Sequence, residues 1–183
     1  MTERSMTQKE IGETGLLIIY TGEGKGKTTA ALGMVFRALG RNHKVAVVQF
    51  IKGKWKTGER NFAATLPQLD FSTMGEGFTW ESSDLNIDKK AAETAWEKAK
   101  GFIHSGEYFL IVLDEITYTV HHDFLPLADI VSTLQNRPKN LTVVLTGRGA
   151  PKELVEMADL VTEMSKVKHP FDKGVPAKPG VDF

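Results

Sequence analysis

TGEGKGKTT, Thr21 to Thr29, lies between the apolar run GLLIIY and the segment AALGMVFRALG, whose apolar residues recur at helical spacing. A strand, a glycine-rich turn and a helix are therefore predicted in that order. Gly26, Lys27 and Thr28 supply the second half of the phosphate-loop pattern G-x-x-x-x-G-K-[ST]. In that pattern, backbone N–H groups converge on phosphate oxygens at a helix N-terminus. The stretch predicts a triphosphate, carried with a divalent cation, at this turn.

The loop departs from the pattern at its first glycine, which would fall at Thr21, whereas Gly22 and Gly24 follow that position. We expect Lys27 to contact phosphates and Thr28 to offer its hydroxyl to Mg²⁺, with Mn²⁺ as the alternative cation. Glu23 is unexpected, because a carboxylate inside an anion cradle repels the ligand. The predicted nucleotide contacts of the loop are Gly22, Glu23, Gly24, Lys25, Gly26, Lys27, Thr28 and Thr29.

Two carboxylates, Asp114 and Glu115, end the apolar run YFLIVL, which is typical of a central strand covered on both faces. A Mg²⁺ ion on a phosphate loop takes a carboxylate from a neighbouring strand end. Asp114 and Glu115 are both candidates for this carboxylate. A general base or an acidic helix cap remains an alternative role for this pair. Arg148, in TGRG after the next strand, is expected to reach the phosphates, with a plain surface role as its alternative.

Short β-branched runs alternate with segments of helical period, which indicates βα units on a mostly parallel sheet. We predict a single α/β domain of the P-loop NTPase-like (RecA-like) class, with about six strands flanked by helices. Residues 15–165 form this domain, residues 1–14 a flexible N-terminal segment, and residues 166–183 an extended tail packed on or over the domain. Gly40 is expected to close the first helix in the left-handed conformation, and Pro126 to open a later helix at its first position.

Composition limits the classes of function. The chain has 183 residues, 23 basic and 23 acidic residues and no cysteine. Because its positive and negative charges balance, the chain has no overall electrostatic attraction to nucleic acid or to a membrane surface. The lack of cysteine excludes a disulfide framework. No apolar run approaches membrane-spanning length. We expect a cytoplasmic protein whose partners bind at defined sites and not through its overall charge.

Two groups of side chains stay ambiguous on spacing alone. Phe78 and Trp80 lie in the glycine-flanked stretch GEGFTWESS, where they either fold back onto the core or form a wall against a flat apolar ligand. His121 and His122 offer a metal site or a general base. Adjacent histidines point in different directions on any regular element, so we expect a solvated loop there.

Several stretches, taken in order, resemble the ATP:corrinoid adenosyltransferases of the CobA/BtuR type. They are YTGEGKGKTTAA, VVQFIKGKW, TGERN, GEGFTW, VLDEITY, TGRG and VKHPFDKGV, and they extend from about Tyr20 to the C-terminus. The resemblance implies that the 5′-deoxyadenosyl group of ATP is transferred to Co(I) of a reduced corrinoid, with release of triphosphate. This reaction serves adenosylcobalamin biosynthesis or salvage.

The resemblance also implies roles for particular residues. Lys27 would contact phosphate, Thr28 and Glu115 would hold Mg²⁺ with Asp114 next to them, and Phe78 with Trp80 would pack against the lower face of the corrin. Arg148 matches the arginine of the family's TGRG stretch. It implies a homodimer and an electron-donor flavoprotein or another reductase as partner. Two other functions stay open: a P-loop NTPase or small-molecule kinase that releases ADP, and a non-catalytic, nucleotide-gated corrinoid carrier.

Overall fold

The computed structural model describes residues 14–51, 57–73 and 85–182 of the chain. Its centre is a six-stranded, all-parallel sheet with the strand order β3-β2-β4-β5-β1-β6. The strands are β1 (Leu17–Thr21), β2 (Val45–Gln49), β3 (Leu69–Thr73), β4 (Leu110–Asp114), β5 (Thr142–Thr146) and β6 (Leu160–Glu163). The predicted α/β class with about six parallel strands is confirmed.

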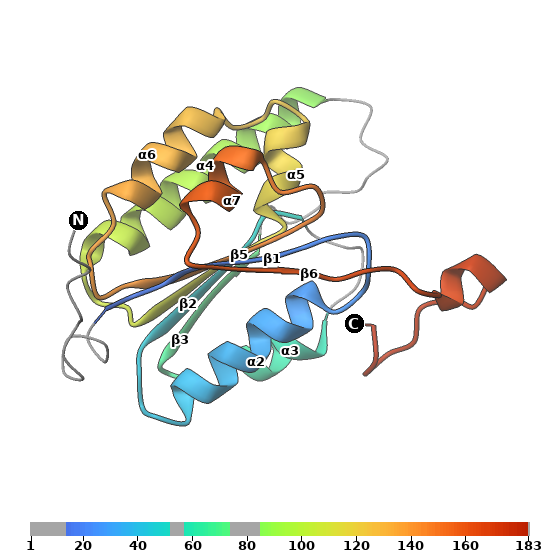
Figure 1. Ribbon diagram of the computed structural model, residues 1–183. Helices are drawn as coiled ribbons and strands as arrows, with labels where there is room; N and C mark the ends of the chain where they lie inside the picture. The colour runs from blue at the N-terminus through green and yellow to red at the C-terminus, as the bar shows by residue number, and fades with distance from the viewer. Residues whose placement is uncertain (1–13, 52–56, 74–84, 183) are drawn as a thin grey trace, which may run out of the picture.

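Helices cover both faces of the sheet (Figure 1). On one face lie α2 (Lys27–Leu39) and α3 (Gly58–Ala63). On the other lie α4 (Leu85–Ser105), α5 (Ile116–His121), α6 (Leu127–Gln135) and α7 (Lys152–Met157). A short 3₁₀ helix, η1 (Pro170–Lys173), interrupts the chain that follows β6. Within the described residues, no helix combines the length and the apolar character needed to cross a membrane.

The alternation of side chains along the strands divides the core into two layers. Ile18, Val112 and Val144 pack beneath α2. Their neighbours in the chain point the other way, so that Leu113 and Leu145 pack with Trp96 of α4 and other residues of the opposite helices. Because β1, β2, β4 and β5 are apolar on both faces, they need cover from helices on both sides, as the continuous apolar runs predict.

The order of the strands brings distant parts of the chain to one edge. β5 lies between β1, which leads into the glycine loop, and β4, which ends in the two acids. Since all strands are parallel, their carboxyl ends face the same way, and the residues after Thr21, Asp114 and Thr146 meet there. Ligands of open α/β sheets bind at this edge.

Several local predictions were wrong. Gly40 has φ −63° in the right-handed region, and the left-handed residue nearby is Asn42 with φ 60°. Pro126 is the N-cap of α6, one position before its first helical residue. His121 ends helix α5 and His122 caps it, so the pair lies on a helix end and not in a loop, although both side chains are exposed as expected. Phe78 and Trp80 lie outside the described residues.

We predict that the core of the α4 layer carries much of the stability. Trp96 is 2% exposed and its Nε1 donates to Asp129 Oδ2 at 2.7 Å. Trp96→Ala removes a buried ring and this hydrogen bond, and should lower the free energy of unfolding by about 3–5 kcal/mol. Phe36 of α2 is 73% exposed, so Phe36→Ala should change it by less than about 0.5 kcal/mol. Urea unfolding measures both, and equal losses would contradict this account of the core.

Candidate nucleotide-binding site

The glycine loop joins β1 to α2, and its lysine points back into it. Lys27 is the first residue of α2 and is 6% exposed. Its Nζ donates to the carbonyl oxygens of Gly22 at 2.7 Å and Gly24 at 2.8 Å. Burial lowers the pKa of Lys27, an effect opposed by the nearby carboxylate of Glu115. The ammonium group therefore lies inside the loop, at the positive end of a helix dipole, as a phosphate site requires.

Protein packing requires two of the loop glycines. A Cβ on Gly22 would lie 2.5 Å from the carbonyl oxygen of Met164, and one on Gly24 would lie 2.7 Å from it. The N–H of Gly24 donates to this same oxygen at 2.6 Å. The chain after β6 thus runs directly against the loop. Thr21, which stands where the pattern has its first glycine, accepts from the N–H of Ala150 at 3.1 Å.

Asp114 is buried, 4% exposed, and accepts three hydrogen bonds. Its Oδ1 accepts from Thr28 Oγ1 at 2.9 Å and from Thr146 Oγ1 at 2.6 Å, and its Oδ2 accepts from Gln49 Nε2 at 3.1 Å. Burial raises the pKa of Asp114, while these three hydrogen bonds oppose the rise. Because Thr28 donates its only hydroxyl proton to Asp114, the lone pairs of its oxygen remain available to a cation.

Glu115 follows in the left-handed conformation, with φ 58°. Its N–H donates to Thr146 Oγ1 at 2.8 Å. Burial raises the pKa of Glu115, as does the charge of Asp114, whereas Lys27 and Arg148 lower it. This left-handed turn places a second carboxylate beside the loop lysine, immediately after the strand residue that holds Thr28.

These groups line one cavity of 610 Å³. Its wall includes residues 25–29 of the loop, Asp114, Glu115 and, from the end of the chain, residues 180–182. Asp182 forms an ion pair with Lys25. A second cavity of 460 Å³ has Glu115 in its wall together with Arg148 and residues of α5. Glu115 therefore lies between two hollows at the same sheet edge.

The TGRG turn is fixed by α5. The carbonyl oxygen of Arg148 accepts from Thr117 Oγ1 at 2.8 Å and lies 3.1 Å from His121 Nε2. The Arg148 side chain, 67% exposed, pairs with Glu23 at 3.2 Å. This ion pair gives the unexpected carboxylate of the loop a partner, although both side chains are too exposed for it to add much stability.

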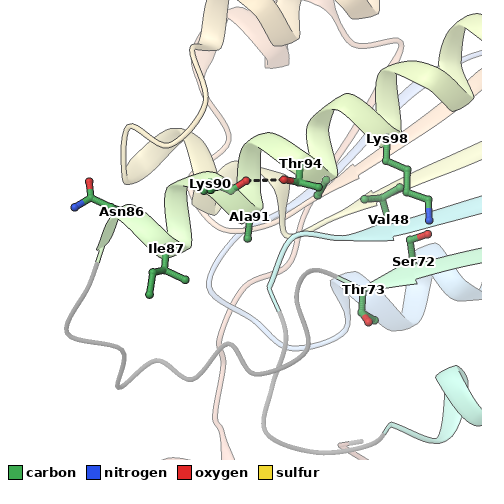
Figure 2. Close-up of a pocket in the computed structure, with 10 residues that line it drawn as sticks. Val48, Ser72, Thr73, Asn86, Ile87, Lys90, Ala91, Thr94 and Lys98 are labelled. Atoms are coloured by element: carbon green, nitrogen blue, oxygen red, sulfur yellow. Dashed lines mark hydrogen bonds between the residues drawn. The ribbon is translucent and has the colours of Figure 1, made fainter.

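A third cavity, of 670 Å³, opens between α4 and the ends of β2 and β3 (Figure 2). Its wall is mostly apolar and includes Val48, Thr73 and Ala91. Figure 2 shows Lys98 extending from α4 toward Ser72 of β3. The residues that follow Thr73 in sequence include Phe78 and Trp80, which lie outside the described residues, so their predicted role stays a prediction.

The structure brings together most of the predicted site, including the loop, both acids and Arg148. Sequence reasoning missed Gln49, Thr146 and Thr117. The first two end strands β2 and β5, and a polar residue at the carboxyl end of an apolar strand was the signal available for both. Thr117 and His121 belong to α5, which the sequence analysis did not predict as a helix.

The donors around Thr28 suit a magnesium ion. Mg²⁺ prefers oxygen ligands and, on nucleotides, is held by one or two protein groups together with phosphates. Thr28, with free lone pairs, and the neighbouring carboxylates are ligands of this type. Among the described residues no group of three or more His, Cys, Asp or Glu is placed to hold a metal ion by itself. One hydroxyl and two carboxylates fit a cation that shares its ligands with nucleotide phosphates.

A parallel sheet with a glycine loop entering a helix, a buried lysine and two strand-end carboxylates defines a P-loop nucleotide-binding protein of the RecA-like class. The sequence profile of one family, described as "ATP:corrinoid adenosyltransferase BtuR/CobO/CobP", matches residues 13–183. The chain belongs to this family.

Relatives and a solved structure agree with this assignment. The chain is 45% identical over 171 residues to a corrinoid adenosyltransferase of Escherichia coli K12, covering 93% of this chain and 87% of that protein. It is 44% identical over 171 residues to corrinoid adenosyltransferase CobA of Salmonella typhimurium, with the same coverage. In fold, it is similar to the flagellar accessory protein FlaH of Methanocaldococcus jannaschii, with a TM-score of 0.52 and 12% identity over 82% of this chain and 71% of that chain.

We predict that the TGRG turn tolerates no side chain at Gly147. This residue has φ 139°, and an added Cβ would lie 2.0 Å from Thr117 Oγ1. Gly147→Ala should lower the free energy of unfolding by more than about 2 kcal/mol. Gly33 is the matched control, because it lies in α2 with nothing within 4 Å of the added atom. Gly33→Ala should stabilise the protein by about 0.5–1 kcal/mol, and thermal unfolding that ranks the two variants the other way would contradict the assigned packing.

Proposed function

We propose that this protein transfers the 5′-deoxyadenosyl group of ATP to Co(I) of a corrinoid and releases triphosphate. The observation that carries the proposal is the Lys27–Thr28 loop at the sheet edge, beside Asp114 and Glu115, in a chain that belongs to the adenosyltransferase family. The family's description names both substrates, ATP and a corrinoid. A reduced corrinoid is the acceptor, because the transfer requires a nucleophilic metal.

The reaction requires the protein to position the two reactants and to stabilise the charge of the leaving group. The electron pair of Co(I) attacks C5′ of the ribose, the C5′–O bond breaks, and its electron pair leaves with the triphosphate. No proton is removed from the nucleophile, so no general base is needed. The chain has to hold the two reactants in line and to stabilise the negative charge that grows on the leaving group. Lys27 and the N–H groups of residues 22–29 suit the second task.

Thr28 and Glu115 are the residues that we propose to hold Mg²⁺, with Mn²⁺ as an alternative. When bound, the cation supplies positive charge against the triphosphate oxygens. Thr28 would offer the lone pairs left free by its bond to Asp114, at 2.9 Å. Glu115 would add a carboxylate from the neighbouring strand end. Gly22, Glu23, Gly24, Lys25, Gly26, Lys27, Thr28, Thr29 and Arg148 remain the proposed contacts to the nucleotide.

The acceptor side of the proposal concerns an aromatic pair and an apolar cavity. Phe78 and Trp80 are proposed to pack against the lower face of the corrin, where an apolar contact replaces an axial ligand and eases reduction of cobalt. The apolar cavity lined by Thr73 and Ala91 has volume for part of such a ligand. The proposal also includes a flavoprotein or other reductase as partner, a homodimer and a cytoplasmic location. It further includes a domain of residues 15–165 with a covering tail.

The reaction product separates the proposed transfer from hydrolysis, phosphoryl transfer and mere binding. Anaerobic incubation with ATP, Mg²⁺ and chemically reduced cob(I)alamin should yield triphosphate and a corrinoid with the light-sensitive spectrum of a new cobalt–carbon bond. Chromatography and absorption spectroscopy measure the two products. Release of ADP would show an NTPase or kinase, and binding of both ligands without turnover would show a carrier.

Lys27 should matter for both binding and rate. Lys27→Ala removes charged hydrogen bonds to phosphate and is expected to weaken ATP binding roughly 10-fold or more and to slow transfer. Lys152 is the matched control, since its side chain is 84% exposed on α7 and forms an ion pair with Glu156 of its own helix, at 3.3 Å. Isothermal titration and steady-state rates measure the effects. Normal kinetics in a folded Lys27→Ala protein would remove this lysine from the site.

A further inference from the structure

We propose that Thr146 is a positioning residue that sets both acids of the site, Asp114 and Glu115, through its single hydroxyl group. The inference rests on the proposed function only in taking these acids to act on the cation of a bound nucleotide. Thr146 ends β5, is fully buried, and lies in none of the cavities described above. It therefore acts through its neighbours and not by touching substrate.

The sheet register explains how a residue of β5 reaches the acids of β4. Leu113 pairs with Leu145, so the next position along places Asp114 beside Thr146. On the other side, Gln49 of β2 pairs with Asp114. Residues that share a register row of a parallel sheet project to the same face. This row faces α2, as does the preceding alternate residue Val144, and so it faces the helix that carries Thr28.

The hydroxyl group of Thr146 makes one hydrogen bond with each acid, and together these hydrogen bonds determine where its proton points. Its Oγ1 accepts from the N–H of Glu115 at 2.8 Å, so its only proton is free to go to Asp114 Oδ1, at 2.6 Å. A serine retains both interactions. A valine, which has nearly the same shape, retains neither and leaves the N–H of Glu115 without this partner.

Two consequences follow for the cation site. The same Oδ1 atom accepts from Thr28 at 2.9 Å, so the orientation of the Asp114 carboxylate decides where the lone pairs of Thr28 point. Glu115 has φ 58°, a conformation that a non-glycine residue adopts only when its surroundings hold it there. The bond from its N–H to Thr146 is one of those restraints. Loss of one hydroxyl group therefore loosens two predicted cation contacts at once.

The test measures how ATP binding depends on Mg²⁺, without a corrinoid. Wild-type protein, Thr146→Val and Thr146→Ser are titrated with Mg²⁺ at fixed ATP, and the half-saturating Mg²⁺ concentration is read from nucleotide binding and from the Mg²⁺-dependent rise in melting temperature. Residues behind a metal's direct ligands typically change metal affinity about 10–100-fold. We expect a rise of at least about 10-fold for Thr146→Val and less than about 3-fold for Thr146→Ser.

Thr133→Val is the matched control, because Thr133 is a buried threonine of α6, 6% exposed and outside the site. It should leave the half-saturating Mg²⁺ concentration unchanged whatever its effect on melting temperature. If Thr146→Val does not fold, Thr146→Cys takes its place, since the thiol is a weak donor of similar size. It should also raise that concentration.

A Thr146 variant that melts earlier but keeps the wild-type Mg²⁺ dependence would overturn the proposal, because only packing would then have been lost. So would a serine variant as impaired as the valine variant. The outcome is separate from the proposed reaction. A wild-type protein that binds ATP with Mg²⁺ but makes ADP would refute the adenosyl transfer while leaving the role of Thr146 to be decided by the same titration.

Discussion

A buried carboxylate needs hydrogen bonds, and Asp114 obtains them from three separate elements of the fold. Burying an unpaired charge costs several kcal/mol, so each donor to this group is held in place by that cost. Gln49 comes from β2, Thr146 from β5 and Thr28 from α2. The carboxylate therefore fixes the first turn of α2 against the sheet. Since that turn carries Lys27 and Thr28, the geometry of the glycine loop depends on an acid that does not need to touch phosphate.

A second set of contacts holds the loop from the opposite side. The chain after β6 approaches the loop so closely that Gly22 and Gly24 have no room for a Cβ. The carbonyl oxygen of Met164 accepts a hydrogen bond from the N–H of Gly24. Thr21 joins the same loop to the residue after TGRG. Preorganisation of this kind matters for a triphosphate leaving group, because amides and charges that are already aimed need little rearrangement when the negative charge develops. These contacts account for the positions of Gly22 and Gly24 in the displaced glycine pattern.

Local pattern was enough to predict most of the elements, although not α5, whereas contacts between strands were not visible in it. The period of the apolar residues predicted about six strands alternating with helices, and the strand-loop-helix order predicted the position of Lys27. The left-handed residue after α2 was placed at Gly40, but the chain adopts that conformation at Asn42, so the helix end is set by the turn that follows. Gln49 and Thr146 lie 65 and 32 residues from Asp114, and only the strand order makes them neighbours. The partner of Glu23, Arg148, was hidden for the same reason.

Lys27 shows how the loop's own polar groups set the conditions for binding. Its ammonium group donates to two loop carbonyls, Gly22 and Gly24, and these bonds keep the loop closed around it. A phosphate group that accepts hydrogen bonds from this ammonium group must replace the two carbonyl acceptors. The net binding free energy is then the difference between hydrogen bonds to a charged and to a neutral acceptor. Burial lowers the pKa of Lys27, and the negative charge of a triphosphate acts in the opposite direction. Burial disfavours the charged form of Lys27 in the absence of a ligand. It also strengthens the interaction of the ammonium group with an anion, because little water screens the pair.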